Sequence, residues 1–196
     1  RLEQELRRFW PGGDRADADR LLFYFGGHGD HVDIPNYLTF VKDQQTKRGL
    51  LVTHDHDPKR PLATSFLLDD IIQRHFAFLA PRHVLFLIDS CSSGLALPRM
   101  ADGSDTTVES VMRYQQLALL DSELKGHARN LLVASSGDAK ALYQNGGLFT
   151  KVLIEAIETR TADLNRDGLI QFDELNLHVS NLVKVRSKEL GLEQSP

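Results

Sequence analysis

One stretch decides the fold, and it reads His83-Val84-Leu85-Phe86-Leu87-Ile88-Asp89-Ser90-Cys91-Ser92-Ser93-Gly94. Residues 84–88 form a short, unbroken apolar run, which is typical of a strand buried on both faces of a parallel sheet. Small polar residues and a glycine follow, at the place where open α/β sheets form their ligand crevices. Cys91 is the only cysteine in the chain, and this position makes it a candidate nucleophile. The alternative is a buried small apolar side chain, which is the role of most free cysteines.

A second strand of the same kind is predicted over residues 21–25, Leu-Leu-Phe-Tyr-Phe, and it ends in Gly26-Gly27-His28-Gly29-Asp30. Two parallel strands lying side by side would present His28 and Cys91 at the same edge of the sheet. Glycines on both sides of His28 allow the backbone to turn sharply and to approach a substrate closely. A thiol and an imidazole at one edge can perform nucleophilic catalysis. The alternative is that His28 is only a turn residue.

The segments Tyr24-Phe25-Gly26-Gly27-His28-Gly29 and Leu87-Ile88-Asp89-Ser90-Cys91-Ser92-Ser93-Gly94 resemble the two catalytic segments of caspase/metacaspase-like cysteine peptidases. Among these, the chain is most similar to bacterial caspase-like proteins, from about Leu21 to about Val183. Ser92 is a departure, because metacaspases usually carry a histidine directly after the cysteine. The resemblance implies an α/β fold, a caspase-like α/β/α sandwich with a mostly parallel central sheet. The family's first strand and helix are not recognisable before Leu21, so we expect a sheet that lacks its first strand.

The resemblance also implies a division of one peptidase domain, residues 1–196, into three parts. Residues 1–98 correspond to the large subunit of caspases, residues 99–128 to a linker, and residues 129–196 to the small subunit. Caspases are cut in the linker, which makes Arg99, Arg113 and Lys125 candidate self-cleavage points. An intact loop is the alternative. We expect the chain to be a fragment, a processed piece or one part of a longer protein. Its candidate partners therefore include an upstream activator or the remaining part of a longer chain.

By resemblance, Cys91 attacks the scissile carbonyl and His28 protonates the leaving nitrogen. The backbone N–H groups of Gly29 and Cys91 are the implied oxyanion donors. Asp89 and Asp138 stand at the ends of two strands, and carboxylates beside a pocket select arginine or lysine. We therefore expect cleavage after Arg or Lys, with Asp89 as a strand-end cap as the alternative. A catalytically silent caspase-like scaffold or signalling module is the alternative hypothesis for function.

An acidic loop near the end fits the twelve-residue calcium-binding pattern of EF-hands. Its candidate ligands are Asp163, Asn165, Asp167 and Glu174, with Gly168 at the sixth position. EF-hands usually come in pairs, however, and the chain has no second loop. The alternative is a structural turn such as bacterial caspase-like domains often have here. Calcium is thus a candidate ligand, although the dyad chemistry requires no cofactor.

Composition narrows the expected partners. The formal net charge of −4 argues against nucleic acid or an anionic membrane, and no stretch has the length of a transmembrane helix. The chain has 196 residues, of which 41% are hydrophobic and 26% charged, as in ordinary globular proteins. A single cysteine excludes an internal disulfide, which favours a cytoplasmic location. Protein or peptide substrates with basic residues are the expected partners.

Further elements follow from hydrophobic periodicity. We expect helices over residues 1–10, 66–79 (capped by Ser65), 148–159 and 174–183. A hairpin is expected from residues 36–41 and 49–53, and a third buried strand over residues 130–136. Phe149, Val152, Leu153, Ala156 and Ile157 form the predicted buried stripe of the 148–159 helix.

Overall fold

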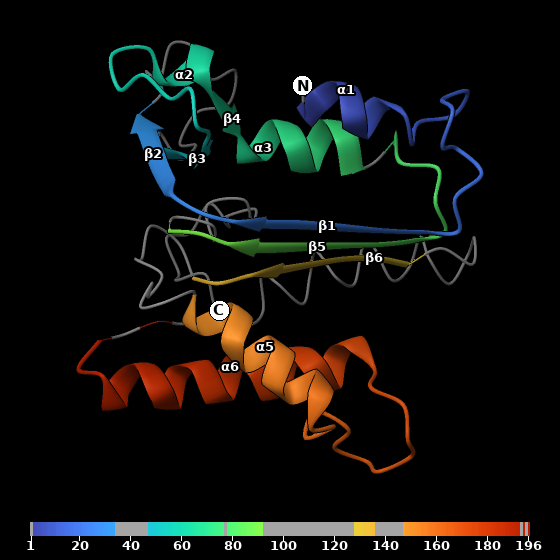
Figure 1. Cartoon of the computed structure of the whole chain (residues 1–196), viewed down its shortest axis with the longest axis vertical. Coiled ribbons are helices and arrows are strands. Elements are labelled where there is room, and N and C mark those ends of the chain that lie inside the picture. The colour runs from blue at the N-terminus through green and yellow to red at the C-terminus, as the bar shows by residue number, and fades with distance from the viewer. Residues whose placement is uncertain are drawn as a thin grey trace, which may run out of the picture.

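The computed structural model describes residues 2–33, 47–76, 78–91, 128–135 and 147–192, together with Gln194 and Pro196. Among these residues, the centre of the fold is a three-stranded parallel sheet in the order β1-β5-β6. The strands are β1 (Arg20–Gly26), β5 (His83–Asp89) and β6 (Ala128–Val133). Helices cover both faces of this sheet (Figure 1), which confirms the predicted α/β/α sandwich with a parallel centre. β6 begins at Ala128, the last residue assigned to the linker, and lies slightly earlier than the predicted strand.

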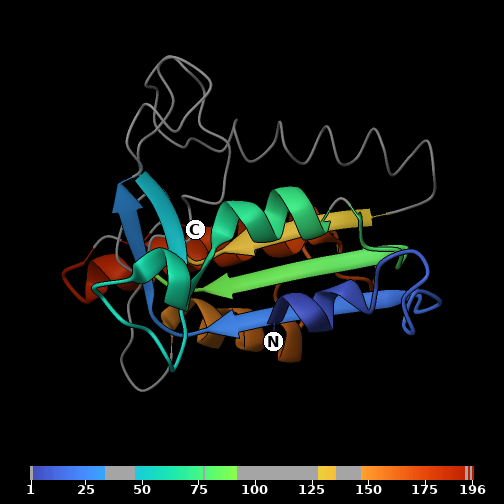
Figure 2. The same ribbon diagram turned by 90° about the horizontal axis from the view of Figure 1, so that it is seen from above.

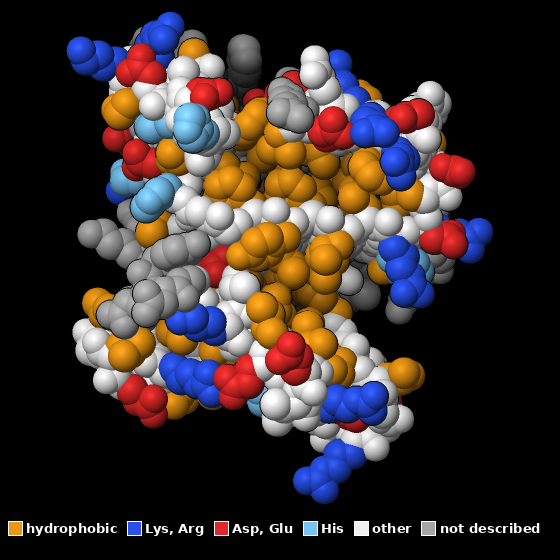
Figure 3. Space-filling view, viewed as in Figure 1, with side chains coloured by type: hydrophobic (Ala, Val, Ile, Leu, Met, Phe, Trp, Pro, Cys, Tyr) orange, Lys and Arg blue, Asp and Glu red, His pale blue; other side chains and the backbone are white. Residues whose placement is uncertain are grey.

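Burial explains why β5 lies in the middle. Its side chains from Phe86 to Asp89 are buried on both faces, as its unbroken apolar run predicts. The Phe86 ring packs against Phe23 of β1 and Phe76, with ring centroids 4.7 and 5.1 Å apart. Within the described part of the chain, β1 lies at the edge of the sheet, with Leu22 63% and Tyr24 51% exposed. Figure 3 shows apolar side chains gathered along this edge.

One face of the sheet is covered by α1 (Leu2–Arg7), α3 (Leu68–Asp70) and the π-helical segment η2 (Ile71–Phe76). The expected helix over residues 66–79 is wrong at its start, because Ser65–Leu67 form strand β4. These residues gain backbone pairing with residues 50–52 of β3 (Lys47–Val52), and the helix begins only where that pairing ends. Ser65 therefore does not cap the helix. Its hydroxyl instead lies 2.7 Å from Nδ1 of His56.

A second, antiparallel sheet has the order β2-β3-β4 and lies beyond the carboxyl ends of β1 and β5 (Figure 2). β2 (Gly29–Asp33) follows His28 directly and pairs with β3. The strand expected over residues 36–41 lies outside the described residues, whereas the one expected over 49–53 corresponds to β3. The short helix α2 (Pro61–Thr64) precedes β4. An ion pair between Arg48 and Asp69 joins β3 to α3, and burial raises the pKa of Asp69 despite this partner.

The opposite face is covered by α5 (Leu148–Glu158) and α6 (Phe172–Glu189). Phe149, Val152, Leu153 and Ala156 are buried as predicted. Ile157 is 48% exposed, so its assignment to the buried stripe was wrong. α6 is longer than predicted because it is stabilised at both ends. A capping box between Gln171 and Glu174 begins it, and Arg186 donates to both carboxylate oxygens of Glu155 at 2.6 and 2.8 Å.

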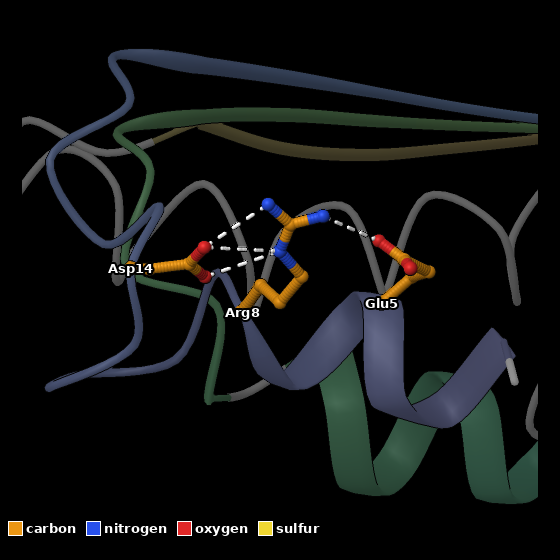
Figure 4. Close-up of polar contacts among 3 residues, drawn as sticks. All are labelled: Glu5, Arg8 and Asp14. Atoms are coloured by element: carbon orange, nitrogen blue, oxygen red, sulfur yellow. Dashed lines mark hydrogen bonds and ion pairs between the residues drawn. The ribbon is translucent and has the colours of Figure 1, made fainter.

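The end of α1 is held by charged side chains. Arg8 lies between Glu5 and Asp14 (Figure 4), donating to Glu5 at 2.8 Å and to Asp14 at 3.0 to 3.3 Å. These contacts raise the pKa of Arg8 and lower the pKa of Asp14. The chain folds back tightly here, because a Cβ at Gly13 would lie 2.3 Å from the Arg8 carbonyl oxygen. The turn carries the chain from α1 toward β1.

Candidate active site

His28 and Cys91 follow two neighbouring strands that are in register to their last residues. Gly26 of β1 pairs with Asp89 of β5, and the N–H of Gly27 donates to the Asp89 carbonyl at 3.1 Å. His28 and Cys91 each stand two positions beyond that last pair. Both residues therefore emerge at the same carboxyl edge of the parallel sheet, as the sequence predicted.

Gly29 brings the two segments into contact. A Cβ built on Gly29 would lie 1.8 Å from the Cys91 carbonyl oxygen and 3.0 Å from Oγ of Ser90. No side chain fits there, so the backbone next to His28 packs directly against the backbone of Cys91. The His28 carbonyl accepts a hydrogen bond from Val52 N at 2.9 Å, which ties the histidine turn to β3.

The environments of the two side chains differ. His28 is exposed, whereas Cys91 is half-buried. The partly sheltered thiol suits a nucleophile, and the exposed imidazole suits its proton carrier. A peptide substrate can reach both groups only if this edge of the sheet is open to solvent. Thus Cys91 is not packed as an aliphatic core residue, which was the alternative role.

The end of β6 arrives beside the nucleophile. Ala134 N donates to the Ile88 carbonyl at 2.9 Å, and Ser135 Oγ donates to the Ser90 carbonyl at 3.4 Å. Ser90 and Ser135 are both buried. The third strand thus supports the backbone that carries Cys91. Asp138, a predicted pocket residue, lies outside the described residues, as do Arg99, Arg113 and Lys125.

Asp89 is fully buried at the end of β5. Its Oδ2 accepts hydrogen bonds from the hydroxyl and the backbone N–H of Thr150, the latter at 3.2 Å. Burial raises the pKa of Asp89, and the two bonds from Thr150 act in the opposite direction. The contact with the first turn of α5 is the one expected of a structural cap, while Oδ1 has no hydrogen-bond partner among the described residues.

The acidic loop, residues 163–174, connects α5 to α6, and its own backbone N–H groups donate hydrogen bonds to its carboxylates. Asp163 accepts hydrogen bonds from Asp167 N at 3.1 Å and Gly168 N at 2.9 Å. Glu174 accepts from Asn165 N at 3.1 Å and from Gln171 N at 3.0 Å. Gly168 has a φ of +88°, which provides the sharp turn. In the described part of the chain, no three His, Cys, Asp or Glu side chains are grouped to hold a metal ion.

A family model described as a caspase domain matches residues 1–196, the whole sequence. The chain belongs to the caspase family. No curated protein and no solved structure matched the chain in the corresponding comparisons. None of the helices described in this caspase domain is long and apolar enough to cross a membrane.

Three residues around Asp89 in this caspase domain were not predicted to contribute to the site. They are Thr150, Tyr24 and Gly147. The Gly146-Gly147 pair before a helix was a signal of close backbone approach, and a Cβ at Gly147 would indeed lie 1.8 Å from Oδ2 of Asp89. The contact between residues 89 and 150 had no local signal, because it depends on how α5 packs on the sheet.

Proposed function

We propose that this caspase domain is a cysteine endopeptidase that cleaves peptide bonds through a dyad of Cys91 and His28. Its family membership supports a cysteine peptidase-like function in general. The observation that carries the proposal is the contact of Gly29 with the Cys91 carbonyl at the shared ends of β1 and β5. This contact brings the backbones of the two turns together, which favours a dyad whose side-chain atoms act within about 2.6–3.2 Å of each other.

The reaction follows from the properties of the two groups. The Cys91 thiolate attacks the scissile carbonyl carbon, and the C–N bond breaks as imidazolium His28 gives its proton to the leaving nitrogen. Water, deprotonated by His28, then attacks the thioester and releases the new carboxylate and the thiol. The backbone N–H groups of Gly29 and Cys91 are the proposed donors to the oxyanion; removal of one such donor typically costs about 2.7–4 kcal/mol. This scheme requires no cofactor.

The proposed substrates are proteins or peptides cut after arginine or lysine. Asp89 supports this preference, because it is a buried carboxylate with Oδ1 unpartnered among the described residues, close to Cys91 in sequence and at the same edge. A buried carboxylate oxygen without a donor is unfavourable, and a guanidinium or ammonium group would supply one. Asp138 is retained as a second proposed pocket acid. A cytoplasmic location fits a catalytic thiol that must stay reduced.

A panel of fluorogenic peptides tests the proposal on the wild type, Cys91→Ala and His28→Ala. We expect hydrolysis after Arg and Lys, no hydrolysis after Asp, and loss of at least about 100-fold in kcat/KM for either variant. Hydrolysis only after Asp would overturn the specificity. A folded wild type that binds peptides without hydrolysing any of them would instead support the catalytically silent scaffold.

A further inference from the structure

One oxygen of the Asp89 carboxylate is held by Thr150, whose hydroxyl in turn contacts the hydroxyl of Tyr24. Thr150, in the first turn of α5, donates to Oδ2 through its hydroxyl and its backbone N–H. The phenol oxygen of Tyr24 on β1 lies 3.0 Å from Oγ1 of Thr150. Since Thr150 gives its only hydroxyl proton to the carboxylate, Tyr24 is the donor in the second contact. Two donors in series therefore connect a half-exposed phenol to a buried carboxylate.

The two carboxylate oxygens of Asp89 have different surroundings. Oδ2 takes both bonds from Thr150, whereas Oδ1 is buried and has no hydrogen-bond partner in the described part of the chain. Gly147 lies directly against the carboxylate, and its missing Cβ would fall 2.7 Å from Oδ1 and 1.8 Å from Oδ2. Residue 147 must therefore be glycine, and it places no side chain next to Oδ1. The arrangement fixes the orientation of the carboxylate and leaves one oxygen in need of a donor.

The same contacts affect the charge of Asp89. Burial raises the pKa of Asp89, whereas the hydroxyl and the N–H of Thr150 lower it. Hydrogen bonds to an ionised carboxylate favour the ionised form. Thr150 therefore keeps the carboxylate charged at a lower pH than burial alone would allow.

We propose that Thr150, supported by Tyr24, is a positioning residue for substrate specificity, which fixes Oδ2 so that Oδ1 of ionised Asp89 receives the cationic side chain preceding the cleaved bond. This proposal rests on the proposed peptidase function. It adds that the preference for a basic residue depends on a side chain of α5 and on one of β1, in addition to Asp89 itself.

The experiment compares matched peptides with arginine or citrulline before the cleaved bond. Citrulline has nearly the same shape as arginine but no charge, so the ratio of the two kcat/KM values reports the interaction of the charge with Asp89. Effects of pH on the chemical step are common to both peptides and cancel in the ratio. We expect the arginine preference of the wild type to disappear at low pH, with a midpoint set by Asp89. Thr150→Val should move that midpoint up by about one pH unit and raise KM for the arginine peptide about tenfold or more.

Three further variants make the result specific. Thr150→Ser keeps a hydroxyl and should restore the midpoint. Tyr24→Phe leaves α5 intact and should move the midpoint in the same direction by a smaller amount, which serves as the test if Thr150→Val does not fold by circular dichroism. Thr159→Val, which removes a hydroxyl bonded to Glu155 O at the far end of α5, should match the wild type.

The outcomes separate the two proposals. One outcome is that the wild type prefers arginine while Thr150→Val and Tyr24→Phe keep the same kcat/KM ratio and the same pH midpoint as the wild type. That result would overturn the role of Thr150 and leave the peptidase function standing. Hydrolysis without any arginine preference in the wild type would overturn the specificity of the proposed function, and the role of Thr150 with it.

Discussion

Replacing Gly29 with alanine should slow peptide hydrolysis about 100-fold without unfolding the domain. The new Cβ would lie 1.8 Å from the Cys91 carbonyl oxygen and 2.9 Å from its carbon, whereas real Cβ atoms stay at least 3.0 Å from their neighbours. The contacting atoms are backbone, which cannot rotate away. The histidine turn and the cysteine turn must therefore move apart by more than about 1 Å, and a misplacement of about 1 Å at a catalytic group can reduce the rate 10²-fold.

The assay measures kcat/KM for an arginyl fluorogenic peptide and the thermal unfolding midpoint of each variant. Gly27→Ala is the matched control on the other side of His28, because the three atoms nearest to its Cβ would all belong to the Phe25 ring, the closest at 3.2 Å. A ring can shift by a few tenths of an ångström, so this variant should stay within about threefold of the wild type. Equal activities of a folded Gly29→Ala and the wild type would refute the close packing of the two turns.

Three other predictions test the surroundings of the site. Burial raises the pKa of Asp89, so over the pH range between the two pKa values the folded state keeps a proton that the unfolded chain has lost, and the wild type loses stability as pH rises. Asp89→Asn has no such proton to lose and should therefore become more stable relative to the wild type in urea unfolding as pH rises above about 4. A stability difference that does not change with pH would contradict this. Phe149→Ala should cost about 3–5 kcal/mol in the free energy of unfolding, because Phe149 is fully buried, whereas Ile157→Ala on the exposed side of α5 should cost less than about 1 kcal/mol. Asp163→Ala should lower the free energy of unfolding by about 1 kcal/mol in EDTA, because Gly168 N loses its acceptor while Asp167 N keeps only Oδ1 of Asn165. Calorimetric heat on calcium addition that is lost in Glu174→Gln would identify ion binding by the loop, and absence of heat in the wild type would exclude it.

The sequence was sufficient to predict the centre of the fold. Residues 21–25, 84–88 and 130–136 contain short apolar runs, whose length favours strands over core helices. β5 is buried as this pattern predicts, whereas Leu22 and Tyr24 of β1 are exposed at the edge of the described sheet. Once the first two strands are parallel neighbours, His28 and Cys91 must appear at one edge. That part of the site follows from strand geometry alone, because the carboxyl ends of parallel strands coincide.

Elements that depend on non-local contacts were predicted less well. Phe66 was the predicted start of a helix and Leu67 part of its apolar face, yet both lie in β4 because β3 offers them backbone partners. Ile157 was assigned to the buried stripe but lies on the exposed side of α5, next to the fully buried Ala156, and is 48% exposed. Whether a residue pairs in a strand or is buried depends on the neighbouring element, and the periodicity of the local sequence does not show where that element lies.

The contacts of Asp89 likewise depend on residues far away in the sequence and could not be predicted from it. The sequence indicated a carboxylate at the strand end and left open whether it lines a pocket or is only a strand-end cap. The structure places Thr150 and Gly147 of a distant segment against it, and its two oxygens differ in a way that permits both roles. Only the packing of α5 on the sheet could reveal this, since residues 89 and 150 have no local relation in the chain.

Labelling of Cys91 by an arginyl peptide with a thiol-reactive end group tests the dyad most directly, because it reports attack by the thiol without requiring turnover. Mass spectrometry would follow the rate of labelling in the wild type and in His28→Ala, with a small neutral alkylating reagent as the measure of thiol exposure. The dyad predicts that the arginyl probe labels Cys91 of the wild type about 100-fold faster than Cys91 of His28→Ala. Equal labelling rates in the two folded proteins would contradict it.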